Sequence, residues 1–454
     1  MRNRAAMFFL VLAFCGSAMA QSYSGDARKI AMGGIGYSEN IAAGLIEEQR
    51  EYRSIVIPLG IIQMVRDIDK LNPDNEDVFD PILAAEYAAN PIHYGFDRVT
   101  GGARGRFVTD IVNAEFTNLN DYRGFDLTDH LVAEGLLSPT WGKTFKVKTR
   151  ADGGFQGFFI GAGPYLSANA DLRIDRELIE VFNSPTDVDV SNRIYHLSNR
   201  SAGQLAMSIA GGYLGRFHLP GGSTPGASDR NGICVAVNYR YLWGFRYEDV
   251  DLALRFDTDA GGEITAPPAG TDPLAIDRVY SDSGRGFALD FGIGAVVNAW
   301  EFGFGVNGVA NRIDWDKMEL TNYRLERLND QGDLIEQDLP TAGERRVELT
   351  EEYIGNVGYT WKDLTAVAEI IRGFQGNSFH GGLEYRFDRI EFRGGARYGL
   401  DRWHPSAGIG LNLGERFSVD VAAFWSTTNV ERRLKPGLAV SLRFNRAGLS
   451  REDS

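Results

Sequence analysis

Charged and imidazole side chains recur at alternate positions of several apolar segments in the second half of this 454-residue chain. Between 379 and 387, for example, His380, Glu384 and Arg386 share one set of alternate positions, and the other set is largely apolar. Two interpretations have equal standing: salt-bridge ladders that fill a narrow interior, or the lining of a water-filled or plugged passage. The candidate lumen-lining residues are Arg240, Arg255, Asp290, Glu301, Glu369, His380, Glu384, Arg386, Glu391, Arg393 and Arg397.

Catalytic and metal-binding patterns have little support in the sequence. The six histidines form no pair at metal-ligand spacing, and no Gly-x-Ser-x-Gly motif occurs. His404 and Ser406 lie close together, but two such residues meet by chance in any sheet. The acidic stretch 66–80 lacks the central glycine and final glutamate of a calcium loop. We therefore predict no enzyme activity, no catalytic residue, no metal and no cofactor.

The elements that must position the charged residues follow a period of two. Five consecutive segments show clean alternation, and each is about nine residues long, close to what a tilted transmembrane strand needs. The five segments are 379–387, 390–398, 406–413, 417–425 and 438–444. A soluble sandwich also alternates, but the apolar positions here are rich in Phe, Tyr and Trp, which is typical of a lipid-facing band. We favour a membrane barrel.

The predicted fold is all-β: an antiparallel transmembrane β-barrel of about 14 strands, within a range of about 12 to 16, with short helices in loops and an N-terminal plug-like segment. The further predicted strands are 105–117, 155–175, 203–213, 231–245, 250–256, 286–297, 300–325, 347–361 and 364–371. Residues 54–62 could add a short strand, and helices are predicted at 78–90, 127–137 and 175–183. Short turns, including one at 246–249, alternate with longer connections, as in bacterial barrels.

The N-terminus predicts secretion. Arg2 and Arg4 precede an apolar run, and a small-residue stretch ends at Ala20, so residues 1–20 read as a signal peptide cleaved after Ala20. Cleavage leaves Cys234 as the only cysteine and lowers the net charge from −14 to −16, which argues against nucleic acid as a partner. The predicted location is the outer membrane of a Gram-negative-type cell. The predicted divisions are a 21–104 plug, periplasmic or first-strand region, a 105–444 barrel and a 445–454 polar tail.

The final strand resembles the C-terminal signal that the barrel-assembly machinery recognises. Its residues are Gly437, Val440, Leu442 and Phe444, and ten more residues follow the aromatic one. The resemblance implies that this machinery and outer-membrane lipid are partners of the chain.

Residues 27–34 read Ala-Arg-x-x-x-Met-Gly-Gly shortly after the predicted signal peptide. This start, followed by a barrel of this length, resembles the FadL/OmpP1-like class of outer-membrane proteins and its PorV-type and TraF-like relatives. Where that class often has Asn-Pro-Ala, this chain has residues 39–44 with no proline. The resemblance implies passage of small hydrophobic molecules across the outer membrane, with a small hydrophobic ligand as partner. The alternative is a structural or docking barrel with a sealed lumen that serves a secretion or surface-assembly system.

Overall fold

The protein is described by a computed structural model. It describes residues 26–34, 52–71, 94–96, 110, 118–123, 129–137, 141–149, 154–219, 231–265, 268, 271–325, 334–348, 351–373, 376–399, 402–414, 417–426 and 434–445. Antiparallel strands dominate these residues and hydrogen-bond into one sheet, which confirms the predicted all-β class. No helix within the described ranges is long and apolar enough to cross a membrane.

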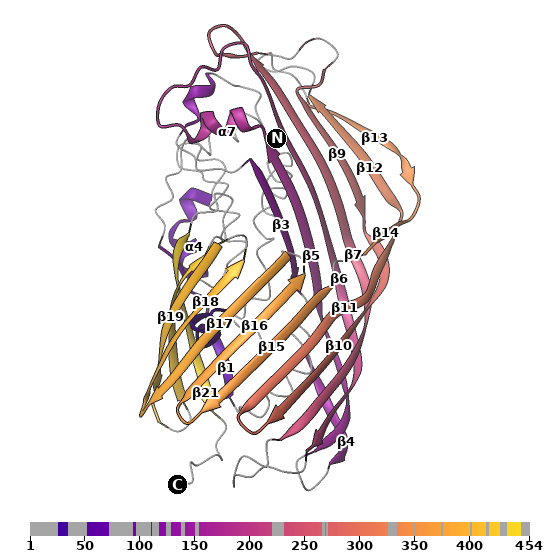
Figure 1. The fold of residues 1–454 in the computed structure, drawn as a ribbon. Helices are drawn as coiled ribbons and strands as arrows, with labels where there is room; N and C mark the ends of the chain where they lie inside the picture. The colour runs from indigo at the N-terminus through magenta and orange to yellow at the C-terminus, as the bar shows by residue number, and fades with distance from the viewer. Residues whose placement is uncertain are drawn as a thin grey trace.

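The sheet curls into the wall of a barrel (Figure 1). Its first half begins with two short strands, β3 (His130–Leu137) and β4 (Trp141–Thr149), which both pair with β5 (Phe155–Ile174). The long strands are β5, β6 (Ile194–His218), β7 (Gly232–Thr258), β10 (Ser283–Val297) and β11 (Trp300–Asp316). Shorter hairpin strands continue the wall: β15 (Glu352–Trp361), β16 (Leu364–Gly373), β17 (Gly376–Phe387), β18 (Ile390–Gly399), β19 (Arg402–Asn412), β20 (Phe417–Ser426) and β21 (Lys435–Asn445).

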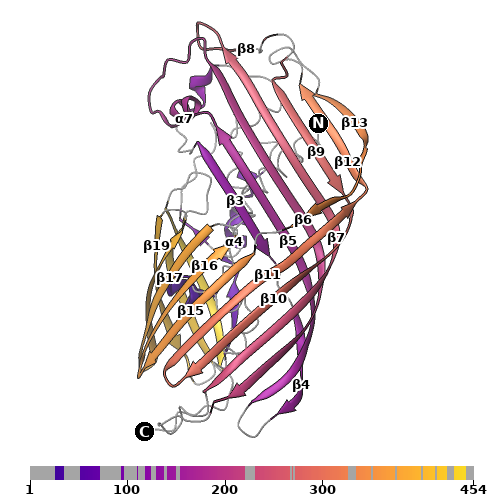
Figure 2. The ribbon, with the colours of Figure 1, turned by 45° about the vertical axis from the view of Figure 1, so that its right-hand side comes forward.

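The remaining elements are short. β1 (Tyr52–Ile57) and β2 (Tyr94–Gly95) pair with the free edge of β21. β8 (Ile264–Thr265), β9 (Leu274–Ser281), β12 (Met318–Leu325), β13 (Leu334–Ala342) and β14 (Arg345–Val347) extend the long-strand side. The helices are α2 (Ala27–Ala31), α4 (Leu59–Arg66), α7 (Arg176–Asn183), η3 (Ile68–Leu71) and η4 (Leu119–Asp121). Figure 2 shows that the long strands rise well beyond the hairpin strands.

Alternation gives the wall two different faces. Glu384 pairs across strands with Arg393, and both side chains are buried on what we call the inner face. Tyr385 pairs with Phe392 one position along, and these rings are about half exposed on the outer face. Large apolar side chains cover the outer face of nearly every wall strand, among them Tyr239, Trp243, Trp300, Phe302, Phe379, Trp403, Ile409 and Phe444. An aromatic outer surface of this extent fits lipid rather than water.

The buried face changes along the long strands. In the lower part of β6, Ala206, Ser208 and Ala210 are buried on the inner face. In its upper part, Tyr195 and Asn199 are buried on the opposite face. There α7 and η4 cover an apolar cluster built from Leu119, Leu178, Phe182, Tyr195, Leu252, Leu254, Phe256 and Ile276. The apolar outer stripe thus continues above the lipid-facing band and is shielded from water by α7.

Several sequence predictions are wrong. Residues 127–137, predicted as a helix, contain β3, because pairing with β5 outweighs local propensity. The turn predicted at 246–249 does not exist: β7 continues through it and takes up one extra residue, Phe245, as a bulge against β6. The single strand predicted at 300–325 breaks at Lys317, which has a φ of 51°.

Other predictions agree with the structure or fall outside it. β5 and α7 occupy their predicted positions, and the predicted strand at 54–62 ends at Ile57, after which Pro58 precedes α4. The signal peptide, the helix at 78–90, the tail beyond 445 and nearly all of the strand at 105–117 lie outside the described residues. The strand number therefore stays a prediction, although 231–245 and 250–256 are one strand rather than two.

Candidate functional site

The helix α2 lies on the inner face of the wall, against β18, β19, β20 and β21. Asp26 caps it by accepting a hydrogen bond from the backbone N–H of Arg28 at 2.9 Å. The hydroxyl of Ser441 donates to Asp26 at 3.1 Å and accepts from the N–H of Ala27 at 3.2 Å. Every residue of α2 is buried, so residues 26–34 are anchored inside the barrel, and none of them belongs to a strand.

Two glycines of the wall let the end of α2 approach the backbone closely. Gly382 of β17 and Gly395 of β18 are cross-strand partners. A Cβ on Gly395 would lie 2.3 Å from the nitrogen of Gly33, and one on Gly382 would lie 2.4 Å from the carbonyl oxygen of Met32. No larger residue fits either position without moving the backbone.

Polar side chains of the wall bind the backbone that follows α2. The Ser406 hydroxyl donates to the carbonyl of Ala31 at 3.2 Å and accepts from the N–H of Gly33 at 3.1 Å. His380 Nδ1 lies 2.8 Å from the carbonyl oxygen of Gly33, which can only accept, so Nδ1 carries a proton. His380 Nε2 is 3.0 Å from Ser378 Oγ.

A cluster of ion pairs joins α2 to four wall strands, and we call it the lumenal cluster. Its members are Arg28, Glu384, Arg386, Glu391, Arg393, Asp420 and Arg443. Arg28 holds Glu384 through two bonds of 2.7 and 2.9 Å. Arg393 Nε lies 2.7 Å from the same carboxylate, and Arg393 Nη1 lies 2.7 Å from Asp420.

The cluster continues through Arg393 and Arg443, which both contact Glu391; the Arg443 contact measures 2.6 Å. Four guanidinium groups therefore face three carboxylates. Buried ion pairs contribute little net stability, but removing one partner costs about 3–5 kcal/mol because a buried charge loses its compensation. The cluster therefore fixes where α2 sits.

The structure gathers some of the sequence-predicted residues and separates others. Glu384, Arg386, Glu391 and Arg393 meet in the lumenal cluster. Glu369, His380 and Arg397 form one buried cross-strand row beside it. Arg240 and Asp290 pair at 2.7 Å, Arg255 pairs with Asp257 at 3.2 Å, and Glu301 lies on β11 at its lower end. Whether these residues line a passage stays a prediction. The role in barrel assembly of four residues of β21 also stays a prediction; they are Gly437, Val440, Leu442 and Phe444.

Sequence reasoning missed Arg28, Asp420 and Arg443 as partners. Asp420 and Arg443 occupy the polar positions of two alternating strands, so the same pattern that selected Arg393 could have selected them. Arg28 gave no periodic signal, because it belongs to a five-residue helix. Among the described residues, no group of three His, Cys, Asp or Glu side chains could hold a metal ion.

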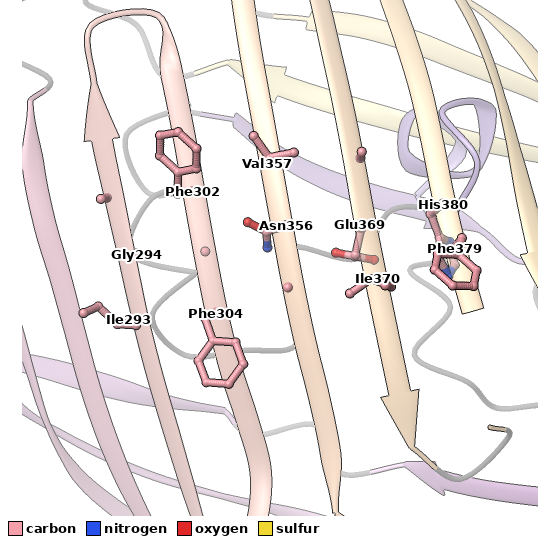
Figure 3. A pocket seen from close by; sticks show the side chains of 14 residues that line it. Ile293, Gly294, Phe302, Phe304, Asn356, Val357, Glu369, Ile370, Phe379 and His380 are labelled. Atoms are coloured by element: carbon pink, nitrogen blue, oxygen red, sulfur yellow. The ribbon is translucent and has the colours of Figure 1, made fainter. Parts of the chain in front are cut away.

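An open hollow of about 740 Å³ lies on the outer face of β10, β11, β15, β16 and β17. Figure 3 shows Phe302 and Phe304 on one side of it and Ile370 and Phe379 on the other. Gly355 lies between Phe304 and Ile370 in the cross-strand row, so the missing side chain leaves the space open. Inner-face residues in its lining, such as Glu369, are each adjacent in sequence to an outer-face residue. The hollow is therefore an apolar recess in the lipid-facing surface.

The fold and its two faces define a class: an antiparallel β-barrel of the outer-membrane type. No protein-family model and no curated protein matches the chain. Among solved structures, it is similar to the toluene transporter TbuX of Ralstonia pickettii, with a TM-score of 0.33, 11% identity, and 70% of this chain and 87% of that one covered. The toluene transporter TodX of Pseudomonas putida gives a TM-score of 0.29 at 11% identity, with 70% and 87% covered.

A porin of Rhodopseudomonas blastica also matches, with a TM-score of 0.21, 9% identity, and 63% and 100% covered. TbuX and TodX are FadL-family proteins, the class that residues 27–34 resemble.

Proposed function

We propose that this protein lets small hydrophobic molecules cross the outer membrane, and that its N-terminal segment obstructs the lumen. The observation that carries the proposal is the position of α2: it is held inside the barrel by polar contacts but is no part of the wall. An obstruction of this kind can be displaced while the hydrogen bonds between wall strands stay intact.

The inner face near the middle of the long strands carries a packed apolar cluster. Trp315 is fully buried there and packs with Tyr165, Leu242, Tyr247 and Ile313. Its indole N–H donates to Gln204 at 3.2 Å, so the ring is fixed in orientation. The class resemblance of residues 27–34 favours apolar over ionic solutes.

The test is single-channel conductance of the refolded protein in planar bilayers. Full-length protein is compared with a deletion of residues 26–34, which spares β1, and with a deletion of the equally long 446–454 as control. We expect silence from full-length protein and the control, and steady conductance after the first deletion.

Uptake of labelled toluene by cells that carry each variant then tests the substrate class. Faster uptake with the 26–34 deletion supports passage of hydrophobic molecules. Silence of all three proteins, with heat-modifiable gel mobility showing that each barrel is folded, would mean a sealed lumen and would favour the docking role instead.

A further inference from the structure

Three arginines gather on the outer face where β11 pairs with both β10 and β14. Arg285 pairs across strands with Asp314, which pairs in turn with Arg346. Arg312 lies two residues before Asp314 and therefore on the same face. We call these three arginines and Asp314 the rim cluster.

The rim cluster is oriented by its own contacts. One carboxylate oxygen of Asp314 lies 2.8 Å from Arg346 Nε, and the other lies 3.3 Å from Arg312 Nε. The Arg312 guanidinium also lies 5.3 Å from the ring centre of Phe287. Both arginines bind through Nε, and their side chains stay 42% and 57% exposed. Within the rim cluster three guanidinium groups face one carboxylate, and Glu348 near Arg346 and Asp316 on the same face of β11 are the neighbouring carboxylates.

The height of the cluster places it at a membrane boundary. The short connections, such as 298–299 and 362–363, lie at one end of the barrel, which is the periplasmic end in bacterial barrels. Val297, at that end, and Arg285 are twelve positions apart in β10. At about 3.3 Å per residue and a tilt of about 40°, they rise about 30 Å, the thickness of the hydrocarbon core. The rim cluster therefore lies at the level of the outer headgroups.

The surface beside and below the cluster suits acyl chains. Tyr241 and Trp243 are 40% and 56% exposed and lie in register with Phe287 and Arg285. Aromatic rings mark the interface of a membrane protein, with apolar chains on one side and headgroups on the other. Arginine binds phosphate through paired N–H groups, and basic pockets at this level take anionic lipid headgroups.

We propose that the rim cluster binds the phosphate of an outer-leaflet lipid headgroup, with the acyl chains of that lipid against Tyr241 and Trp243. The lipid is a phosphorylated glycolipid of the lipid A type. This site is independent of the passage proposed above, because it lies on the opposite face of the wall from α2.

The test is native mass spectrometry of the purified full-length protein in detergent, titrated with lipid A or with dephosphorylated lipid A. The variant is Arg312→Gln with Arg346→Gln, and the control is Arg173→Gln, an exposed arginine paired with Asp171 in the upper part of the long strands. We expect lipid A to bind the wild-type and the control alike. The double variant should bind at least about tenfold more weakly, as the loss of two charge-assisted contacts predicts. Heat-modifiable gel mobility confirms that each barrel is folded.

A second variant keeps the charge and removes the paired donors. Arg312→Lys with Arg346→Lys should bind with intermediate affinity, and it serves as the test if the glutamine variant does not fold. Equal binding of phosphorylated and dephosphorylated lipid, or unchanged binding by the variants, would overturn the proposal. Displacement of lipid A by millimolar inorganic phosphate would mean a site for free phosphate and would overturn the assignment to a lipid.

Discussion

Removing Arg28 should release α2 from the wall without unfolding the barrel. Arg28 makes two charge-assisted bonds to Glu384, at 2.7 and 2.9 Å, and each such bond is worth about 1.5–3 kcal/mol. Glu384 keeps Arg393 and Arg386 after the change, so it is not left as a bare buried charge. The remaining cluster has three guanidinium groups and three carboxylates, and this balance is why the wall should tolerate Arg28→Ala.

The expected loss of docking energy is therefore near the lower limit for a broken buried pair, about 3 kcal/mol. That figure corresponds to an increase of about a hundredfold in the undocked population. The reporter is Met32→Cys in a Cys234→Ser background, because Met32 is buried directly after α2. The measurement is the rate of labelling by a membrane-impermeant maleimide, which should rise about a hundredfold with Arg28→Ala if undocking limits access.

Arg386→Ala is the matched control. Arg386 contacts the same carboxylate at 3.1 Å but belongs to β17 and is half exposed, so its loss should leave α2 in place. The reasoning fails if Arg28→Ala is labelled at the wild-type rate. It also fails if Arg386→Ala speeds labelling as much as Arg28→Ala, because the arginine on the helix would then have no special role.

Three other changes test separate parts of the structure. Gly395→Ala should also speed labelling of the Met32→Cys reporter, since its Cβ would lie 2.3 Å from Gly33; an unchanged rate would contradict the close approach. Burial raises the pKa of Tyr195 to about 12, so the neutral ring is favoured in the folded state. The contribution of the neutral Tyr195 ring to folding stability should be complete below pH 10 and should be lost as the pH rises towards 12. Melting of Tyr195→Phe should lack that part of the pH dependence. Trp315→Ala should lower barrel stability by about 3–5 kcal/mol through cavity formation, seen as a lower urea midpoint, and an unshifted midpoint would count against tight packing there.

The alternation of apolar and polar residues was sufficient to predict the C-terminal hairpins. In β17 and β18, one face meets lipid and the other meets the lumenal cluster, so each position has a single environment and a clear period of two. The same pattern predicted Glu384 and Arg393 as inner-face residues. It could not predict that they would meet Arg28, because the contact spans 356 residues of sequence and involves a helix of five.

The long strands were harder to predict because they change their environment midway. In β6 the buried positions shift from even-numbered Ala206 and Ala210 to odd-numbered Tyr195 and Asn199 without any bulge against β5. A search for one continuous period therefore ends near residue 203. In β7 the run Tyr247–Val250 is buried at every position, which hides the alternation and reads as an interruption. Neither feature can be recognised without knowing which elements cover the sheet.

Because the strands differ in length, the two sides of the barrel differ in height above the membrane. β7 has 27 residues and β18 has 10, so at about 3.3 Å per residue they measure about 90 and 33 Å along the strand. At a tilt of about 40°, the first rises about 70 Å and the second about 25 Å, close to the lipid thickness alone. One side of the barrel opening therefore ends at the membrane surface, and the other side projects well above it (Figure 1). A cylindrical pore has the same height on every side. Here one side is taller, so the part of the barrel that another membrane molecule contacts depends on the direction from which it approaches.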